Sequence, residues 1–471
     1  MRQGIGLGFA MLLSACQTWS PDGGMSVVAG IAGGDLNKEV AALRSPEEAE
    51  AARTKVKALL RRQLTADAAV QVALLNNRGL QAAYNELGIA EAAMVQVSLP
   101  PNPIFSLSRV STPIEVEVER QIVANVLALA TLPARADIAA DRFHQAQLRA
   151  ALETLRVAAE TRRAYYRAVA ARELARFLDQ AKSAAETASE LAKRLGETGA
   201  MNKLDQAREH VFYAEITAQL AAARQRAASE RERLIRQMGL WGRDLDFKLP
   251  DGLPAPPRRP MALPAIEREA VRRRVDLQMG RIELDALAKS YGLADATRFI
   301  NLLEVAGISK TQREADGARG TGGGAAVEFQ IPIFDGGEVR VRQAELTYQQ
   351  AVNRLVEKAV NVRSEARDAY RTYRAAYDIA AHYRSEVLPL RQIISEETLL
   401  RYNAMMIDVF SLLAEARQRI NANVAAIDAQ RDFWLASVDL ATAVGGGGVA
   451  SPAAEGPMMA GGGGPSEGGG H

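Results

Sequence analysis

The chain has 471 residues, of which 48% are hydrophobic but only 5% aromatic, and 58 basic and 56 acidic residues leave a formal net charge of +2. Such a balance gives no sign of the clustered basic surface that nucleic-acid binding needs. With so few aromatic residues, alanine and leucine must supply most of the packing. This favours long, closely packed helices over a bulky globular core.

The N-terminus has the features of a secretory signal. Arg2 is followed by an apolar stretch over residues 4–13, too short to span a bilayer, which ends in Leu13-Ser14-Ala15-Cys16. This ending resembles a bacterial lipobox, in which the cysteine is acylated and becomes the mature N-terminus. We therefore expect residues 1–15 to be a signal peptide, Cys16 to carry lipid, and residues 16–65 to be a lipid-anchored linker. The alternative is an ordinary buried cysteine.

Two further features of the sequence indicate which membrane holds the anchor and whether a helix spans it. Gln17 stands where an aspartate would resemble a signal for retention in the inner membrane, so the anchor points to the outer membrane. No later segment has 18 uninterrupted apolar residues, so we expect no transmembrane helix.

The first half of the chain predicts a helix, two strands and a long helical pair. A helix over residues 66–98 is stopped by Pro100, Pro101 and Pro103. Residues 114–119 alternate strictly between apolar and acidic, the period of a strand, and residues 102–110 are the expected partner strand. Residues 134–240 lack proline and break only near residues 196–199. A first arm of about 60 residues would reach roughly 90 Å.

The second half predicts the same order of elements. A helix is expected over residues 263–295, and strands over about 297–308 and 325–333, joined by a glycine-rich loop over residues 309–324. Helices then run over about 338–444, with Pro389 interrupting the first arm. The proline-rich residues 249–264 link the halves. Residues 20–35 and the tail 445–471 are rich in glycine, and we expect them to be disordered.

Matching residues in the two halves indicate a duplication. Leu80 matches Leu277, Pro133 matches Pro332, and Arg208 matches Arg417, in the same order. A spacing of about 200 residues is too long for a solenoid unit and indicates two repeats, over residues 66–248 and 265–444. The helices also carry a coiled-coil rhythm, in which alanine dominates the seam over residues 204–235. A soluble antiparallel coiled coil would show the same rhythm.

A soluble coiled coil does not account for the four predicted strands. Four strands cannot close a barrel, and open edges cannot lie in lipid. If the strands enter a membrane, several chains must pool them, and a trimer would supply about twelve, within the range of such barrels. Glu115, Glu117 and Glu119 would then line the lumen, while Ile114, Val116 and Val118 would face lipid.

A longer set of residues resembles the TolC-like outer-membrane efflux factors, over roughly residues 60–444. The set includes Pro101-Asn102-Pro103 before the first strand. Its most specific part is the run from Phe329 to Gly337, Phe-Gln-Ile-Pro-Ile-Phe-Asp-Gly-Gly, followed by Arg340 and Ala344. In that run, Pro332 ends a strand, and Asp335, Gly336 and Gly337 make a sharp turn into a helix. Two places depart from the family: Val275 stands where proline is usual, and Ala134-Arg135-Ala136 replaces the first repeat's glycine turn.

The resemblance implies a fold and a function. The fold is mainly α with a small β part: duplicated long helical hairpins form an α-barrel, and four strands contribute to a trimeric transmembrane β-barrel. The function is that of a passive exit duct, not an enzyme, for small toxic solutes such as drugs or metal ions. Its partners would be two further copies of itself, a periplasmic adaptor protein, an inner-membrane pump and outer-membrane lipid. The alternative is a periplasmic adaptor or a structural coiled-coil lipoprotein.

The resemblance also points to a gate near the inner end of the helical barrel. The family's two acidic positions fall on Ser411 and Ala414, so Asp408 is the candidate for an acidic ring, with Met405 and Met406 as an alternative hydrophobic constriction. Asp408 is equally suited to cap the helix that follows it. The four histidines show no metal-ligand spacing, so we expect no resident metal. Copper binding by Met458, Met459 and His471 in the tail stays open.

Overall fold

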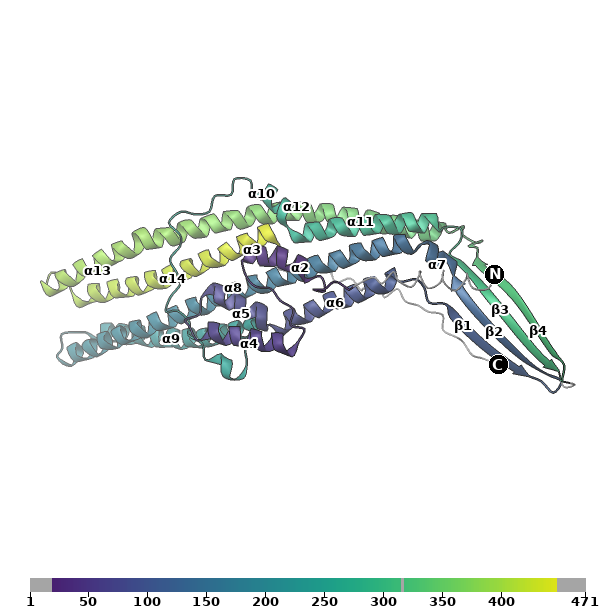
Figure 1. Ribbon diagram of the computed structural model, residues 1–471. Coiled ribbons are helices and arrows are strands. Elements are labelled where there is room, and N and C mark those ends of the chain that lie inside the picture. Colours follow the sequence, from purple (N-terminus) through teal and green to yellow (C-terminus); the bar gives the residue numbers. More distant parts are fainter. Residues whose placement is uncertain (1–18, 315–316, 447–471) are drawn as a thin grey trace.

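The computed structural model describes residues 19–314 and 317–446, and the chain in these ranges is mainly α-helical and elongated (Figure 1). A single four-stranded sheet forms one end of the molecule, and two helical hairpins form the other. Helices run between these ends with few interruptions. The predicted fold class, mainly α with a small β part, is confirmed.

The first repeat contains helices α5 (Ala66–Asn76) and α6 (Arg78–Ser98), strands β1 (Ile104–Ser111) and β2 (Glu115–Asn125), and helices α7 (Val126–Ala130), α8 (Leu132–Glu197) and α9 (Lys203–Met238). The helix predicted over residues 66–98 is thus divided at Asn77, whose side chain accepts a hydrogen bond from the Leu80 amide and caps α6. The α8–α9 turn lies where the sequence places it. There Gly199 has a φ of 75° and Asn202 caps α9.

The second repeat contains helices α10 (Ile266–Arg273) and α11 (Val275–Ala296), strands β3 (Leu302–Glu314) and β4 (Arg319–Gln330), helix α12 (Glu338–His382), the π-helical turn η4 (Tyr383–Val387), and helices α13 (Leu388–Asn403) and α14 (Val409–Gly445). Leu277 is the third residue of α11, as Leu80 is of α6, and both are buried. Pro389 lies in the first turn of α13, directly after the π-helical turn, so α12, the π-helical turn and α13 follow one another without a gap. The 3-10 turn η3 (Gly242–Leu245) precedes the linker between the repeats.

The expected disorder of residues 20–35 is wrong for the residues that follow Gly24. They form α2 (Met25–Val28), the π-helical η2 (Ala29–Gly33) and α3 (Gly34–Leu36), followed later by α4 (Pro46–Leu60). The reason is tertiary: Met25 and Val28 join a buried cluster with Leu80, Leu87 and residues of α8. Helix α4 needs no such help at its start, because Ser45 and Glu48 form a capping box.

The sheet has the strand order β1-β2-β3-β4, with every neighbouring pair antiparallel. The loop predicted over residues 309–324 is wrong. Most of those residues are strand, and Ile308 to Arg313 pair with Gly324 to Arg319. Glycine lowers local strand propensity, but here the β3 ladder satisfies the backbone of the glycine-rich strand.

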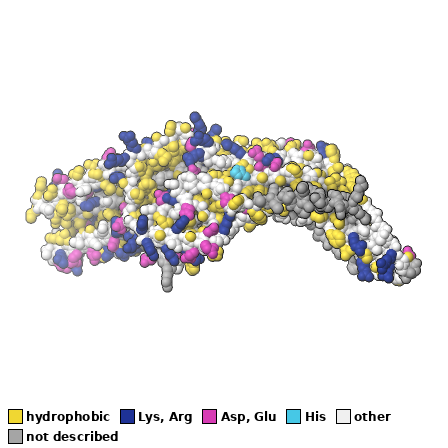
Figure 2. Space-filling model, in the orientation of Figure 1, with side chains coloured by type: hydrophobic (Ala, Val, Ile, Leu, Met, Phe, Trp, Pro, Cys, Tyr) yellow, Lys and Arg dark blue, Asp and Glu magenta, His cyan; other side chains and the backbone are white. Residues whose placement is uncertain are grey.

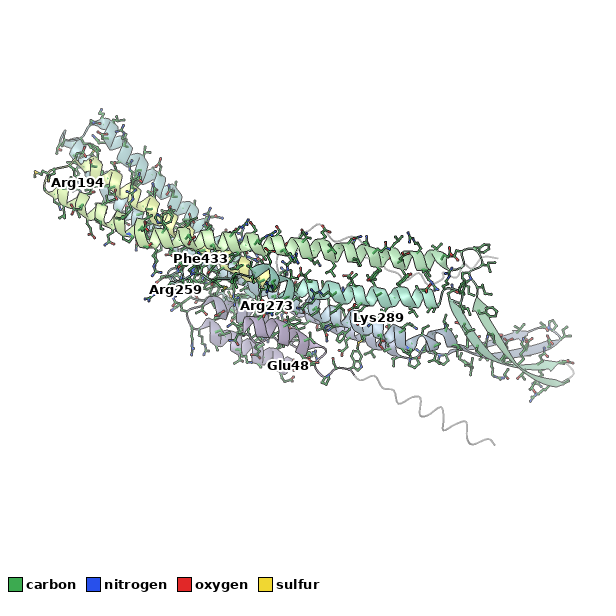
Figure 3. The ribbon with its side chains drawn as sticks, turned by 90° about the horizontal axis from the view of Figure 1, so that it is seen from above. Glu48, Arg194, Arg259, Arg273, Lys289 and Phe433 are labelled. Carbon is green, nitrogen blue, oxygen red and sulfur yellow. The ribbon has the colours of Figure 1, made fainter. Side chains whose placement is uncertain are left out.

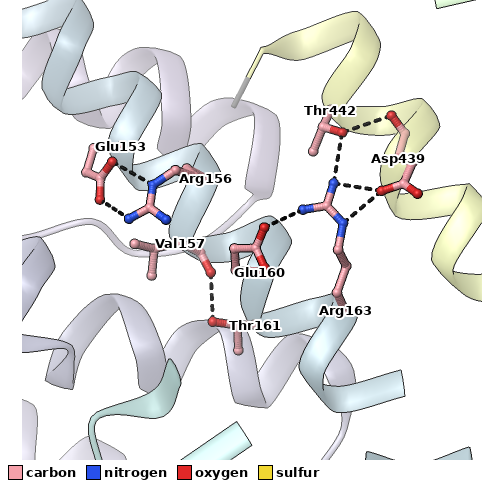
Figure 4. A network of polar contacts seen from close by, with 8 residues as sticks. All are labelled: Glu153, Arg156, Val157, Glu160, Thr161, Arg163, Asp439 and Thr442. Carbon is pink, nitrogen blue, oxygen red and sulfur yellow. Dashed lines mark hydrogen bonds and ion pairs between the residues drawn. The ribbon is translucent and has the colours of Figure 1, made fainter. Parts of the chain in front are cut away.

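An aromatic cluster and a polar network lie where the two repeats meet. Phe433 of α14 is fully buried midway along the molecule (Figure 3), where it packs against Tyr373, Tyr377 and Trp434. Nearby, Arg163 of α8 reaches across to α14 (Figure 4): its Nε donates to Asp439 Oδ1 at 2.7 Å and its Nη2 to Thr442 Oγ1 at 3.3 Å. The buried guanidinium thereby fixes the contact between a helix of each repeat.

Candidate functional site

The four strands present two chemically different faces. Residues directly opposite one another in an antiparallel pair project from the same side, so the register assigns every strand residue to a face. All six strand glutamates fall on one side, which we call the acidic face: Glu115, Glu117, Glu119, Glu304, Glu314 and Glu328. Ser106, Ser108, Gln121 and Gln312 share this face.

One cation lies on the acidic face. Lys310 Nζ is 3.1 Å from Glu117 Oε1 and 2.8 Å from Glu119 Oε2, a contact made between β3 and β2. The predicted lumen residues Glu115, Glu117 and Glu119 therefore share one face, and Lys310 compensates part of their charge. A single chain does not close a barrel, so their position in a lumen stays a prediction.

The opposite side, which we call the apolar face, carries exposed hydrophobic side chains. Val116 and Val118 lie on this face. Its largest exposed members, each between 40% and 64% accessible, are Phe105, Leu107, Ile122, Val305, Val327 and Phe329. A row of large apolar side chains facing outward on a thin sheet marks an interaction surface or a membrane contact.

Among the described residues, neither edge of the sheet has a further neighbouring strand. There β1 pairs with β2 alone, and β4 pairs with β3 alone. The outward-facing backbone groups of both edge strands are a template for pairing with another chain.

The sharp turn from β4 into α12 has the geometry that the glycines suggest. Gly336 and Gly337 have φ values of 57° and 74°, and a Cβ on Gly337 would collide with the carbonyl oxygen of Arg298. The Gly336 amide donates to Pro332 O at 2.8 Å, and the Gly337 amide donates to Asp335 Oδ1 at 3.0 Å. These contacts fix the angle at which the helical region leaves the sheet.

The corresponding junction in the first repeat is built differently. β2 runs directly into the short helix α7, and the Asn125 side chain accepts from the Ala128 amide at 2.7 Å. Asn125 Nδ2 also donates to Glu304 Oε1 on β3. Pro133 lies in the first turn of α8, so it starts a helix, whereas its partner Pro332 precedes a turn. A capped helical turn here replaces the glycine turn.

The hairpin ends lie remote from the sheet, where Figure 3 marks Arg194 near the end of α8. In the second repeat, Asp408 caps α14 by accepting from the Ser411 amide at 2.8 Å. Hydrogen bonds to the Ser411 side chain and backbone hold the pKa of Asp408 below its usual value. Met405 and Met406 are 93% and 73% exposed, and Met405 adopts a φ of 56°. The structure thus gives Asp408 the capping role. A pore ring of Asp408 stays a prediction, since one chain does not form a pore.

A half-buried ion pair, unforeseen from the sequence, joins the two hairpins. Arg417 Nη2 of α14 lies 2.9 Å from Glu209 Oε1 of α9, and the Arg417 guanidinium stacks on Phe212. The same nitrogen donates to the carbonyl of Arg208, so the matched residues of the two repeats are in contact. Glu209 Oε2 and Arg417 Nε have no hydrogen-bond partner within the described chain. Only the match between Arg208 and Arg417 hinted at this contact.

Helix α11 begins at Val275, the position where TolC-like efflux factors usually have proline. Val275 is the buried first residue of the helix, a place that proline also suits. Next to it, Arg274 Nη2 lies 2.8 Å from Asp276 Oδ2, and Arg274 also donates to Glu365 of α12. Burial alone would raise the pKa of Asp276, but the hydrogen bonds and charge of Arg274 outweigh it and leave that pKa below its usual value.

Several predicted positions lie outside the described residues, namely Cys16, Met458, Met459 and His471. Within residues 19–314 and 317–446, no three His, Cys, Asp or Glu side chains are grouped as a metal site would require. In the same ranges, no helix combines the length and apolar character that a membrane span needs.

Comparisons with known proteins give a fold. No protein-family model matches the sequence, and no curated protein is similar to it. Solved structures do match. The Campylobacter jejuni CmeC outer membrane channel has a TM-score of 0.68 and 17% identity, covering 81% of this chain and 86% of that one. The chain has the TolC-like fold.

Two further TolC-like structures match over similar lengths. CusC, described in terms of folding and transmembrane channel formation, has a TM-score of 0.67 and 17% identity, covering 83% of this chain and 92% of that one. The Neisseria gonorrhoeae MtrE outer membrane channel, solved in its open state, has a TM-score of 0.65 and 16% identity, covering 80% of this chain and 88% of that one. The TolC-like arrangement of one sheet and two hairpins therefore extends over most of the chain.

Proposed function

We propose that the chain is one protomer of a homotrimeric outer-membrane duct, which passively exports small toxic solutes. The observation that carries this proposal is the separation of chemistry between the two faces of an open sheet. Glutamates occupy one face, and most of the large exposed apolar side chains lie on the other, although Ile104 and Val110 share the acidic face. Membrane barrels show this alternation, with a polar lumen and an apolar outer band.

The open edges supply the reason for a trimer. Backbone groups of β1 and β4 would remain unsatisfied in lipid, at a cost of several kcal/mol for each group. Because the four strands alternate in direction, β4 of one protomer lies antiparallel to β1 of the next. Three chains then close a barrel of about twelve strands.

Helix α12 has two apolar sides, which supports the assembly of three chains. Its buried residues Val362, Ala366, Tyr373 and Ala380 lie along one side of the helix. Large apolar residues that stay exposed in the single chain lie along the opposite side at helical spacing, namely Val339, Leu346, Val356 and Val360. A helix with two apolar sides is expected in a helical barrel, where it contacts a neighbour on each side.

The N-terminal segment fits a lipid anchor at the periplasmic leaflet. The Ser20 amide donates to the buried Glu91 Oε1 at 2.7 Å, on the part of α6 that leads to the sheet. From Glu91 to the end of α6 at Ser98 the helix rises only about 10 Å. Cys16 is four residues before Ser20, so a chain of at most roughly 14 Å connects them. An acylated Cys16 would thus reach the membrane surface beside the sheet.

The duct is passive in this proposal, and its energy comes from partners. An inner-membrane pump and a periplasmic adaptor would meet the hairpin ends, where Met405 and Met406 are exposed. The exported substances in this proposal are drugs, metal ions or other small toxic compounds. The acidic face favours cations over anions.

The test is conductance in planar bilayers. Full-length protein purified from membranes should form channels that pass potassium in preference to chloride. Replacing Glu117 and Glu119 together by glutamine should lower that preference, whereas Glu47→Gln and Glu50→Gln on the exposed surface of α4 should leave it unchanged. Failure of the wild-type protein to conduct at any voltage would contradict the duct.

A further inference from the structure

The arginines of the sheet follow a pattern that neither the lumen nor the apolar band explains. The strands contain four arginines, Arg109, Arg120, Arg313 and Arg319, and the register places all of them on the apolar face. All six strand glutamates lie on the opposite face. We call these four residues the arginine patch. Figure 2 shows basic side chains gathered near the far end of the sheet.

The members of the patch lie close together without a compensating charge. Arg313 and Arg319 are directly opposite in the β3–β4 pair, and Arg109 is a diagonal neighbour of Arg120 in the β1–β2 pair. Like charges placed directly opposite are destabilising unless an anion lies between them. Each arginine is exposed. The one recorded side-chain contact of the patch is a hydrogen bond from Arg120 Nη1 to Thr311 Oγ1 at 3.3 Å, and no described carboxylate pairs with any member.

The position of the patch along the strands sets its depth. The apolar face of β3 begins, at the helical end, with Leu303, Val305 and Gly307. Arg313 is ten residues after Leu303 on the same face. A tilted strand crosses the hydrocarbon core in about 9–11 residues. If the apolar rows fill the hydrocarbon, Arg313 and Arg319 emerge at the leaflet remote from the helices, beside the turns that end the sheet. Arg109 and Arg120 lie one and two rows closer to the helices, and their long side chains extend to the depth of Arg313 and Arg319.

We propose that the arginine patch binds the phosphate groups of a phosphorylated glycolipid in the outer leaflet of the outer membrane. Guanidinium groups pair with phosphate in a bidentate manner, and two neighbouring guanidinium groups would share one phosphate. The patch faces lipid instead of the lumen, so lipid-borne phosphate is the anion that it meets. This proposal rests on the proposed function, because it requires the sheet to lie in the outer membrane.

The experiment measures lipid retention by full-length protein with native mass spectrometry, using bis-phosphorylated lipid A and its dephosphorylated form as probes. The test variant is Arg109→Gln/Arg313→Gln/Arg319→Gln. The matched control is Arg61→Gln/Arg62→Gln/Arg226→Gln, which removes the same charge from exposed positions outside the sheet. We expect the wild type and the control to retain the phosphorylated lipid, and the test variant to bind it about a hundredfold more weakly, or roughly fivefold for each charge.

Equal retention by the test variant and the control, or equal retention of the two lipids by the wild type, would overturn the proposal. Displacement of the lipid by millimolar inorganic phosphate would also overturn it, because the site would then be a general anion site. Conductance of the same samples in phosphatidylcholine bilayers separates the two proposals. A test variant that conducts normally but loses the glycolipid supports the patch. A wild type that never conducts contradicts the duct, whatever it binds.

Discussion

An arginine placed on the apolar face should destabilise the membrane-inserted protein, whereas the same residue one position away should not. Ile122 lies on the central strand β2, is 55% exposed and shares a row with Phe105 and Gly307 on the apolar face. Its neighbour Gln121 projects to the acidic face at almost the same depth. Ile122→Arg would place a guanidinium in hydrocarbon, which costs about 2–4 kcal/mol near the middle of a barrel. That cost corresponds to roughly a 30- to 1000-fold change in the folding equilibrium.

The matched control is Gln121→Arg, which adds the same side chain beside glutamates in a wet lumen. Guanidinium unfolding in phosphatidylcholine vesicles, followed by protection of the strands from protease, would give the two free energies of unfolding. We expect Ile122→Arg to lose stability and Gln121→Arg to stay within about 0.5 kcal/mol of the wild type, as surface substitutions do. Equal losses in the two variants, or a larger loss for Gln121→Arg, would refute the assignment of the faces.

Four further predictions follow from the turns, the buried charges and the N-terminus. Gly337→Ala should destabilise the protein by at least about 1–2 kcal/mol, because Gly337 has a φ of 74° and Arg298 leaves no room for a Cβ. Gly292→Ala, in open space within α11, should not destabilise it. Thermal unfolding of the two variants compares these effects. Asp276→Asn should cost roughly 1.5–3 kcal/mol at neutral pH, because it removes one of the two carboxylates that pair with the buried Arg274 and leaves only Glu365. Since the pKa of Asp276 is lowered, its contribution is present above its ordinary pKa near 3.8 and is lost as the pH falls through the folded-state value. The difference in unfolding free energy between wild type and variant should therefore be smaller at pH 3 than at pH 7. Asp408→Asn keeps a capping oxygen, so it should leave stability unchanged but reduce cation selectivity and block by multivalent cations in single-channel recordings; unchanged selectivity would move the gate toward Met405 and Met406. Cys16→Ser should leave the precursor unprocessed, and intact-mass analysis that finds no acyl chains on the wild type would count against the lipid anchor.

Local chemistry made much of the fold predictable. The alternation at residues 114–119, the prolines after Leu99 and the glycines near residue 199 each act within a few residues. The structure has a strand, the end of a helix and a turn at these places, in that order. The helical breaks at Asn77 and Arg274 were missed, because the apolar pattern continues across them and the break depends on capping and on a buried ion pair.

The missed elements depend on contacts between distant residues. The glycine-rich β4 gives a loop signal, and only its ladder with β3 makes it a strand. The short helices α2 and α3 follow glycines and depend on packing against α8. The acidic row of β2 was visible in the sequence, but the separation of glutamates and arginines across all four strands required the register. The ion pair between Glu209 and Arg417 joins residues 208 positions apart.

The central claim is that the sheet of one chain is an open fragment of a barrel that three chains complete. Mass photometry of full-length protein extracted from native membranes in mild detergent tests this most directly. The account predicts one dominant particle whose protein mass is three times that of the mature chain, and which light cross-linking before extraction preserves. A monodisperse monomer from the same membranes, with or without cross-linking, would contradict it.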